Sequence, residues 1–120
     1  MPRILAVDDS PSMRQMVSTT LTSAGYDVEQ AADGVEALAL ADKQRFDLVI
    51  TDVNMPNMDG ITLVRELRGK PDYKFVPLLI LTTEATAERK QQGKNAGATG
   101  WLVKPFNPDR LLATIAKVLV

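Results

Sequence analysis

Short apolar runs alternate along the chain with stretches in which apolar residues recur at helical spacing. Four of the runs lie at residues 4–7, 48–51, 78–81 and 101–103, and a fifth, more polar run at residues 26–30 follows Gly25. Continuous apolar runs of this length are typical of parallel strands that are covered on both faces. The pattern therefore predicts five strands of a parallel sheet.

Helix signals lie between the predicted strands. Ser10 and Asn107 each precede a proline, which is typical of a helix start, and Asp33 and Asp59 are further candidate caps. Gly25 is a stop signal for the first helix. We expect these apolar residues to face the sheet: Met13, Met16, Val17, Leu21 and Ala24, then Val35, Leu38 and Ala39, then Leu63, Val64 and Leu67, and finally Leu111, Leu112, Ile115 and Leu119.

The stretch at residues 84–96 predicts a helix of a different kind. Its only candidates for burial are small alanines, and Gly93 near its middle costs about 1 kcal/mol relative to alanine in a helix interior. We therefore expect this helix to be the least firmly packed. It either simply covers an edge of the sheet or is a mobile element whose position can be biased.

Five strands that alternate with five helices predict an α/β fold with a doubly wound, five-stranded parallel sheet and right-handed crossovers. The 120 residues suffice for one domain, residues 1–120, and we expect no output domain after the last helix. No signal peptide or membrane-spanning segment is visible in the sequence. We therefore expect a soluble cytoplasmic protein.

Composition narrows the chemistry. A net charge of −1 gives no electrostatic footprint for nucleic acid or for a membrane surface. The chain has no cysteine, which excludes disulfides and thiolate metal sites, and no histidine, which excludes histidine bases and zinc ligands. Any reaction must therefore rely on carboxylates, lysine, hydroxyl groups or a bound cation.

Polar residues follow four of the predicted strands. Asp8 and Asp9 follow the first strand, Asp52 the third, Thr82 the fourth and Lys104 the fifth. In open α/β sheets, ligands bind outside the carboxyl ends of the strands, which in a parallel sheet lie along one edge. For any one of these residues a cap or a solvated loop position is the simpler interpretation. A complementary set at four strand ends indicates a shared site.

The charges of this set call for a cation. Two like charges about 4 Å apart repel by about 4 kcal/mol at an effective dielectric constant of about 20, and Lys104 alone does not offset three carboxylates. An all-oxygen ligand set with few protein ligands favours Mg²⁺, which keeps several waters and shares phosphate oxygens. Beside such a cation, Asp52 can attack a phosphoryl group as a nucleophile, while Thr82 and Lys104 contact its oxygens.

Four motifs resemble those of the receiver domains of two-component response regulators, and the likeness covers essentially the whole chain. They are VDDS at residues 7–10, TDVNMPNMDG at residues 51–60, LTTE at residues 81–84 and KPF at residues 104–106. The likeness is strongest to the single-domain chemotaxis regulators of the CheY type. That resemblance implies a flavodoxin-like sheet with the strand order 2-1-3-4-5.

The resemblance implies a role for each acidic residue. Asp52 is the phosphoacceptor. The carboxylates of Asp9 and Asp52 and the backbone carbonyl of Asn54 bind Mg²⁺, and Asp8 contributes directly or through water. Asn54 and Glu84 flank the path of the water that hydrolyses the acyl phosphate, so their side chains should influence the lifetime of the phosphorylated state.

The resemblance also implies a switch and its partners. Thr82 and Lys104 contact the phosphoryl group, Thr82 moves toward it, and the aromatic residue of the fifth strand, here Trp101, turns inward as the populations of two states shift. The phosphodonor is a histidine of a sensor kinase, the target is a protein such as the flagellar motor switch, and a phosphatase can assist the reset. The chain is thus expected to be a monomeric signalling switch rather than an enzyme.

Two positions depart from the family pattern. Trp101 stands where tyrosine or phenylalanine is usual, so the indole either acts as the switch aromatic with altered rotamer exchange or simply packs on a helix. Thr83 stands where the family often has a smaller residue, and its bulk is expected to slow small phosphodonors. Neither departure concerns the phosphoacceptor itself.

Other functions fit less well. An aspartyl-nucleophile phosphatase usually needs a second aspartate two positions after the nucleophile, where this chain has Asn54. An EF-hand calcium loop is disfavoured because Pro56 occupies a ligand position and no glutamate ends the loop. A flavodoxin-like cofactor carrier is disfavoured because no Gly/Ser/Thr-rich phosphate loop follows the first strand. A phosphorelay intermediate stays open beside a chemotaxis output protein.

Overall fold

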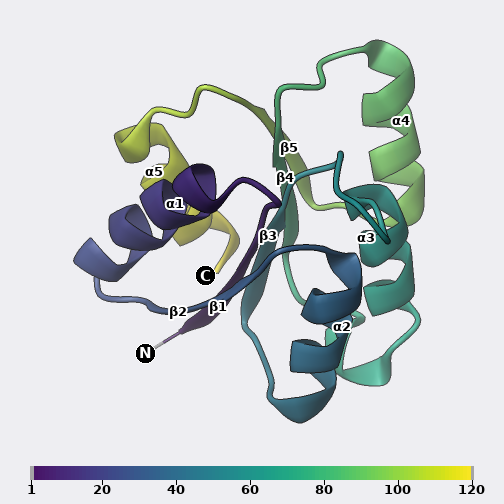
Figure 1. Ribbon diagram of the computed structural model, residues 1–120, viewed down its shortest axis with the longest axis horizontal. Coiled ribbons are helices and arrows are strands. Elements are labelled where there is room, and N and C mark those ends of the chain that lie inside the picture. The colour runs from purple at the N-terminus through teal and green to yellow at the C-terminus, as the bar shows by residue number, and fades with distance from the viewer. Residues whose placement is uncertain (1, 120) are drawn as a thin grey trace.

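The computed structural model describes residues 2–119 and shows a parallel sheet with the strand order β2-β1-β3-β4-β5 (Figure 1). The strands are β1 (Arg3–Val7), β2 (Asp27–Ala31), β3 (Leu48–Thr51), β4 (Leu78–Thr82) and β5 (Gly100–Val103). This confirms the predicted fold and strand order, with β2 lying one residue later than expected. Strands β3 and β4 are buried throughout, as their continuous apolar sequences predict.

Helices cover both faces of the sheet. Figure 1 shows α1 (Pro11–Ser23) and α5 (Pro108–Val118) on one face, and α2 (Gly34–Lys43), α3 (Gly60–Arg68) and α4 (Ala87–Ala96) on the other. Successive strand residues point to opposite faces. Ile4 and Ala6 therefore join the core beneath α1 and α5, whereas Leu5 and Val7 join the core beneath α2 and α3. Within residues 2–119, no helix is both long and apolar enough to cross a membrane.

The predicted caps of four helices are confirmed. In each case the side chain accepts a hydrogen bond from a main-chain N–H of the first turn, at Ser10, Asp33, Asp59 and Asn107. Thr86 caps α4 in the same way, so that helix begins at Ala87 and not at residue 84. Residues 84–86 therefore form a loop beyond the carboxyl end of β4.

The predicted inward faces of α3 and α5 are confirmed, whereas that of α1 is partly wrong. Val17 and Leu21 are buried, but Met16 is 55% exposed. Residues four apart lie on one side of a helix, and Met16 is one position away from that stripe. Ala24, which was also expected inside, is exposed just beyond the end of the helix.

The predicted inward face of α2 is wrong, because the helix is rotated about its axis relative to the prediction. Val35 is 52% exposed and Ala39 is exposed, whereas the buried side chains are those of Ala37 and Ala41. Apolar residues occur on nearly every side of this helix, so the periodicity does not define its orientation. Packing against the sheet and α3 selects the small alanines instead.

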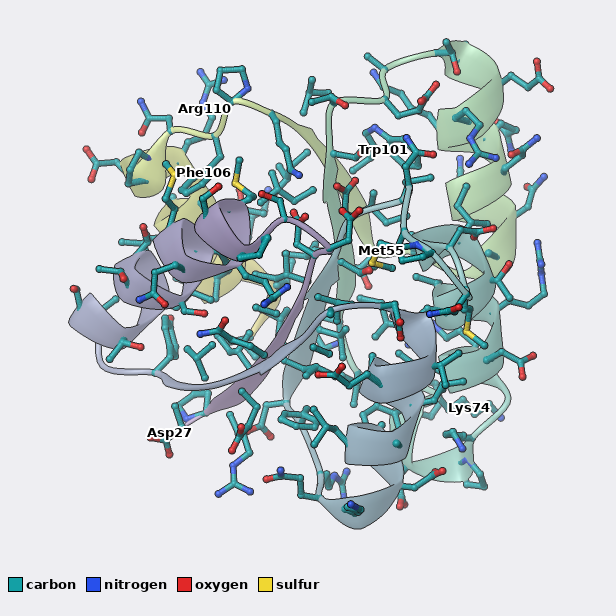
Figure 2. All side chains as sticks on the ribbon, in the orientation of Figure 1. Asp27, Met55, Lys74, Trp101, Phe106 and Arg110 are labelled. Atoms are coloured by element: carbon teal, nitrogen blue, oxygen red, sulfur yellow. The ribbon has the colours of Figure 1, made fainter. Side chains whose placement is uncertain are left out.

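Helix α4 buries only small residues, as its sequence predicts, and its being the least firmly packed helix stays a prediction. Its buried residues are Gly93 and Ala96, both in its C-terminal half. Tertiary packing explains why residue 93 is a glycine, because a β-carbon there would lie 2.8 Å from Cζ3 of Trp101. Figure 2 shows Trp101 between the sheet and α4. The glycine that weakens the helix therefore makes room for the indole ring.

Arg68, at the end of α3, ties the amino edge of the sheet to α4. Its guanidinium donates to the carbonyl oxygens of Gly97 (2.9 Å), Tyr73 (2.8 Å) and Val76 (2.7 Å), and to the hydroxyl of Thr99 (3.2 Å). These contacts join a short 3-10 turn, η1 (Pro71–Tyr73), which the sequence did not predict, to the turn after α4. The C-terminal end of α4 is thus fixed, whereas no residue of its first turn is buried.

Candidate functional site

The strand register brings the predicted site residues together. Val7 pairs with Thr51 at the ends of β1 and β3, so the residues that follow, Asp8 and Asp52, lie side by side. Thr82 is the last residue of β4 and pairs with Val103, which precedes Lys104. The carboxyl ends of adjacent parallel strands therefore place these groups at one edge of the sheet, as expected.

Lys104 bridges two of the carboxylates. Its Nζ lies 2.7 Å from Oδ2 of Asp8 and 2.9 Å from Oδ2 of Asp52. The three side chains are between 8% and 12% exposed. Burial acts to lower the pKa of Lys104, but the hydrogen bonds and negative charges of Asp8 and Asp52 outweigh it, so the pKa of Lys104 lies above its ordinary value. The ammonium is therefore charged at neutral pH.

The remaining oxygens of both buried carboxylates are held by the main chain. Oδ1 of Asp8 accepts from the N–H of Ser10 at 2.9 Å, and Oδ1 of Asp52 accepts from the N–H of Val53 at 2.6 Å. The carbonyl oxygen of Asp52 accepts from the hydroxyl of Thr51 at 2.9 Å. These contacts fix the orientation of both carboxylates before any ligand arrives.

The acidic cluster fits a divalent cation. One carboxylate oxygen from each of Asp8, Asp9 and Asp52 lies within 4.8 Å of the others. Asp9 is exposed, and within residues 2–119 its carboxylate has no hydrogen-bond or ion-pair partner. Lys104 forms ion pairs with Asp8 and Asp52, and its single positive charge faces three carboxylates. Such an all-oxygen set suits Mg²⁺, and the backbone carbonyl of Asn54 lies in the loop directly after Asp52.

Thr82 and Trp101 are linked through one residue of the loop after β4. Thr82 is fully buried, and its hydroxyl accepts from the N–H of Glu84 at 3.2 Å. The indole N–H of Trp101 donates to the carbonyl oxygen of Glu84 at 2.9 Å. The carboxylate of Glu84 accepts from the side-chain amide of Asn54 at 3.4 Å. Glu84 therefore joins the strand end that carries Thr82 to the indole and to the loop after Asp52.

Gly60 belongs to the site, although it has no predicted role beyond its place in the motif at residues 51–60. A β-carbon at this position would collide with the carbonyl oxygen of Asp52 and lie 3.1 Å from Cα of Val53. The N–H of Gly60 donates to the carbonyl oxygen of Val53 at 2.8 Å. The start of α3 thus packs directly on the main chain that carries Asp52. Sequence spacing alone gives no sign of this contact.

Comparison with known proteins agrees with this geometry. The profile of the response regulator receiver domain matches residues 4–116. The solved structure of chemotaxis protein CheY4 of Vibrio cholerae is 62% identical, with a TM-score of 0.95 and 98% of each chain covered. The receiver domain of the sensor histidine kinase PA1611 of Pseudomonas aeruginosa PAO1, solved with a magnesium ion in its active site cleft, is 31% identical, with a TM-score of 0.91 and coverage of 98% and 97%.

A doubly wound sheet with a lysine-bridged acidic cluster at its carboxyl edge defines the class of protein. With the profile match and the structural neighbours, the chain belongs to the response regulator receiver domain family, whose members act as signalling switches. It is also 40% identical over 119 residues to the DNA-binding dual master transcriptional regulator RpaA of Synechocystis, covering 99% of this chain and 49% of RpaA. The chain thus spans about half the length of curated relatives such as RpaA.

Proposed function

We propose that the chain is a phosphorylation-dependent switch of chemotaxis, with Asp52 as its phosphoacceptor. The observation that carries the proposal is the Lys104 ammonium held between Asp8 and Asp52, with the carboxylate of Asp9 in reach of the same cation. This arrangement presents a nucleophilic carboxylate, a fixed positive charge and a metal-binding set at one place. Such a combination suits phosphoryl transfer, which depends on positioning and charge stabilisation.

The proposed reaction is the transfer of a phosphoryl group from a phosphohistidine of a sensor kinase. A carboxylate oxygen of Asp52 forms a bond to phosphorus while the bond from phosphorus to the imidazole nitrogen breaks, and the electron pair of that bond leaves with the imidazole. Lys104 then pairs with a phosphoryl oxygen, and the hydroxyl of Thr82 donates to another. Hydrolysis of the acyl phosphate, unaided or helped by a phosphatase, resets Asp52.

We assign the metal site to the carboxylates of Asp9 and Asp52 and the backbone carbonyl of Asn54, with Asp8 acting directly or through water. When bound there, Mg²⁺ supplies positive charge next to the phosphoryl oxygens. Asp9 is the carboxylate best able to turn toward the ion, because it is exposed and has no partner in the described part of the chain. Asp8 is already held at both of its carboxylate oxygens.

We also propose that the message is read at β5 and the start of α5. A hollow of about 340 Å³ lies there, and Figure 2 shows Trp101, Phe106 and Arg110 around this part of the molecule. Val103 and Pro105, the neighbours of Lys104 in the chain, both line the hollow. A change at the phosphoryl-binding lysine is thus one residue away from a surface that a target protein can occupy. The flagellar motor switch is the target that a chemotaxis role implies.

The likeness to CheY4 favours a chemotaxis output protein over a phosphorelay intermediate, because it extends over 98% of both chains at 62% identity. The receiver of a histidine kinase is less similar, at 31% identity. The two roles differ in the fate of the phosphoryl group. An output protein loses it to water, whereas a relay intermediate passes it to a second histidine.

The central test of the proposal is incubation of the protein with acetyl phosphate and Mg²⁺, followed by intact mass measurement. We expect one added phosphoryl group per chain, and none when Mg²⁺ is removed with a chelator. A protein that binds Mg²⁺ but gains no mass from acetyl phosphate or from a phosphorylated kinase would contradict the assignment.

Replacement of Lys104 by methionine is expected to slow phosphorylation and to tighten Mg²⁺ binding at the same time. Loss of a group that stabilises developing charge typically costs about 100-fold in rate. Removal of the ammonium also removes a cation that competes with Mg²⁺ for Asp8 and Asp52. Phosphorylation rates with acetyl phosphate and calorimetric Mg²⁺ titrations measure the two effects.

The matched control for Lys104 is Arg110→Met. Arg110 is an exposed cation on the same β5–α5 segment, and within residues 2–119 its guanidinium makes no hydrogen bond or ion pair. This variant should leave both quantities unchanged. Weaker Mg²⁺ binding in Lys104→Met would show that the lysine organises the acids instead of competing with the metal.

Trp101 is proposed to sense the phosphorylated state, and its fluorescence should change when beryllofluoride and Mg²⁺ are added. The indole N–H is bonded to Glu84, whose own N–H is bonded to Thr82. A shift of Thr82 toward the phosphoryl group therefore disturbs the surroundings of the indole. It is the only tryptophan of the chain, so the emission reports on it alone. Unchanged emission in a protein shown to carry the adduct would assign Trp101 a packing role only.

A further inference from the structure

Arg14, the fourth residue of α1, is hydrogen-bonded to the loop that carries Asp8 and Asp9, although it has no predicted role. Its Nη1 donates to the backbone carbonyl oxygen of Asp8 at 2.7 Å, and its Nε donates to Oε1 of Gln30 at 3.3 Å. Arg14 also lines a small hollow of about 10 Å³ together with Asp8 and Asp52. The guanidinium thus ties the loop between β1 and α1 to the edge strand β2.

The contact of Arg14 falls on the one polar group of Asp8 that the strand ladder and the site leave free. The N–H of Asp8 donates to the carbonyl oxygen of Ala31 at 3.1 Å, and its two carboxylate oxygens accept from Ser10 and Lys104. Its carbonyl oxygen is held by Arg14. Every hydrogen-bonding group of Asp8 is therefore engaged, and the last of them by a side chain outside the acidic cluster.

The carbonyl of Asp8 belongs to the peptide unit that leads to Asp9. Because a peptide unit is planar, fixing the direction of that carbonyl also fixes the plane through the Cα of Asp9. Asp9 has no side-chain partner of its own in the described part of the chain, and it is exposed. The direction in which its carboxylate leaves the main chain therefore depends on the peptide plane that Arg14 holds.

We propose that Arg14 is a positioning residue for cation binding. By holding the carbonyl oxygen of the Asp8–Asp9 peptide, it sets the direction of the Asp9 carboxylate. The proposal rests on the proposed function, in that the cation is the Mg²⁺ of the phosphoacceptor site. This role needs two donors of one rigid guanidinium, Nη1 on the carbonyl of Asp8 and Nε on the side chain of Gln30. A simple charge effect of Arg14 predicts the opposite behaviour, because a nearby positive charge repels Mg²⁺.

A positioning role and a simple charge effect predict opposite changes in Mg²⁺ affinity when Arg14 is replaced. Calorimetric titration of the full chain with MgCl₂ distinguishes them. Arg14→Met keeps most of the side-chain length but has no charge and no donors. Partners that orient metal ligands are typically worth about 10-fold or more in affinity, so we expect Mg²⁺ binding to weaken about 10-fold. Arg14→Lys keeps the charge but not the fork, and should also bind Mg²⁺ more weakly than the wild-type chain. As a control, Lys117→Met removes an exposed cation in the last turn of α5 and should leave the Mg²⁺ affinity unchanged.

A second measurement needs no metal. In the metal-free protein, the NMR order parameter of the Asp9 amide is expected to fall in Arg14→Met, because the peptide plane loses its clamp. If circular dichroism shows that Arg14→Met does not fold, the affinity and order parameter of Arg14→Lys decide instead.

The outcomes separate this inference from the function on which it rests. Mg²⁺ binding in Arg14→Met that is equal to or tighter than in the wild-type chain, with an unchanged order parameter at Asp9, would overturn the positioning role and leave the phosphoacceptor site intact. A wild-type chain that binds no Mg²⁺ would overturn the proposed function, and this inference with it.

Discussion

The Asp52→Asn variant is expected to gain no phosphoryl group from acetyl phosphate, under conditions in which the wild-type chain gains one. An amide is a far weaker nucleophile than a carboxylate, and it removes one of the charges that hold Lys104 and the metal. Asparagine has nearly the same shape, so the fold and the contact with the Val53 N–H can persist. Intact mass and a peptide map locate the adduct, and its lability to hydroxylamine identifies an acyl phosphate.

The matched control for Asp52 is Asp47→Asn. Asp47 lies just before β3, at the opposite end of the strand from Asp52, and is exposed, with its carboxylate accepting from the N–H of Arg3. This variant should be phosphorylated like the wild-type chain. An adduct that persists in Asp52→Asn would place the phosphoacceptor at another residue, and the assignment of Asp52 would be wrong.

The Gly60→Ala variant is expected to lose about 3 kcal/mol of unfolding free energy, at the upper end of the usual cost of overpacking. The new β-carbon would collide with the carbonyl oxygen of Asp52, which is main chain and has no rotamer to change. The loop that carries Asp52 must therefore shift, and phosphorylation by acetyl phosphate should slow as well. Urea unfolding followed by circular dichroism measures the first effect, and adduct formation the second.

Gly69→Ala provides the comparison for Gly60. Gly69 has an ordinary φ of −76°, and a β-carbon there would meet the carbonyl oxygen of Glu66 at 3.4 Å, which is normal van der Waals contact. A substitution of this kind is usually within about 0.5 kcal/mol of neutral. If Gly60→Ala proves as stable as Gly69→Ala and is phosphorylated normally, then α3 does not press on the Asp52 main chain.

Most of the fold can be predicted from the sequence because the strands and caps carry local signals. Continuous apolar runs define β3 and β4, and the pairs Ser10-Pro11 and Asn107-Pro108 define the starts of two helices. The orientation of α2 cannot be predicted in this way, because apolar residues occupy nearly all its sides. The presence of Gly93 in α4 is likewise explained only by Trp101, a residue on another element.

Site residues that local sequence signals mark can be predicted, whereas those defined by tertiary contacts cannot. Asp8, Asp52, Thr82 and Lys104 can be predicted because each ends or directly follows a recognisable strand, and parallel strands end along one edge. The contributions of Gly60 and Arg14 cannot, since each acts through a main-chain carbonyl. A carbonyl is present at every residue, so its partner leaves no mark in the local sequence.

Arg68 holds the C-terminal end of α4 through carbonyl oxygens and the single hydroxyl of Thr99. This Arg68 clamp therefore depends on very few side-chain identities, which limits how far it constrains the sequence in evolution. Lys74 and Phe75, the latter 88% exposed, can therefore be exchanged freely while the clamp stays. We expect related chains to diverge in this loop, at the edge of the sheet opposite Asp52, while keeping the arginine.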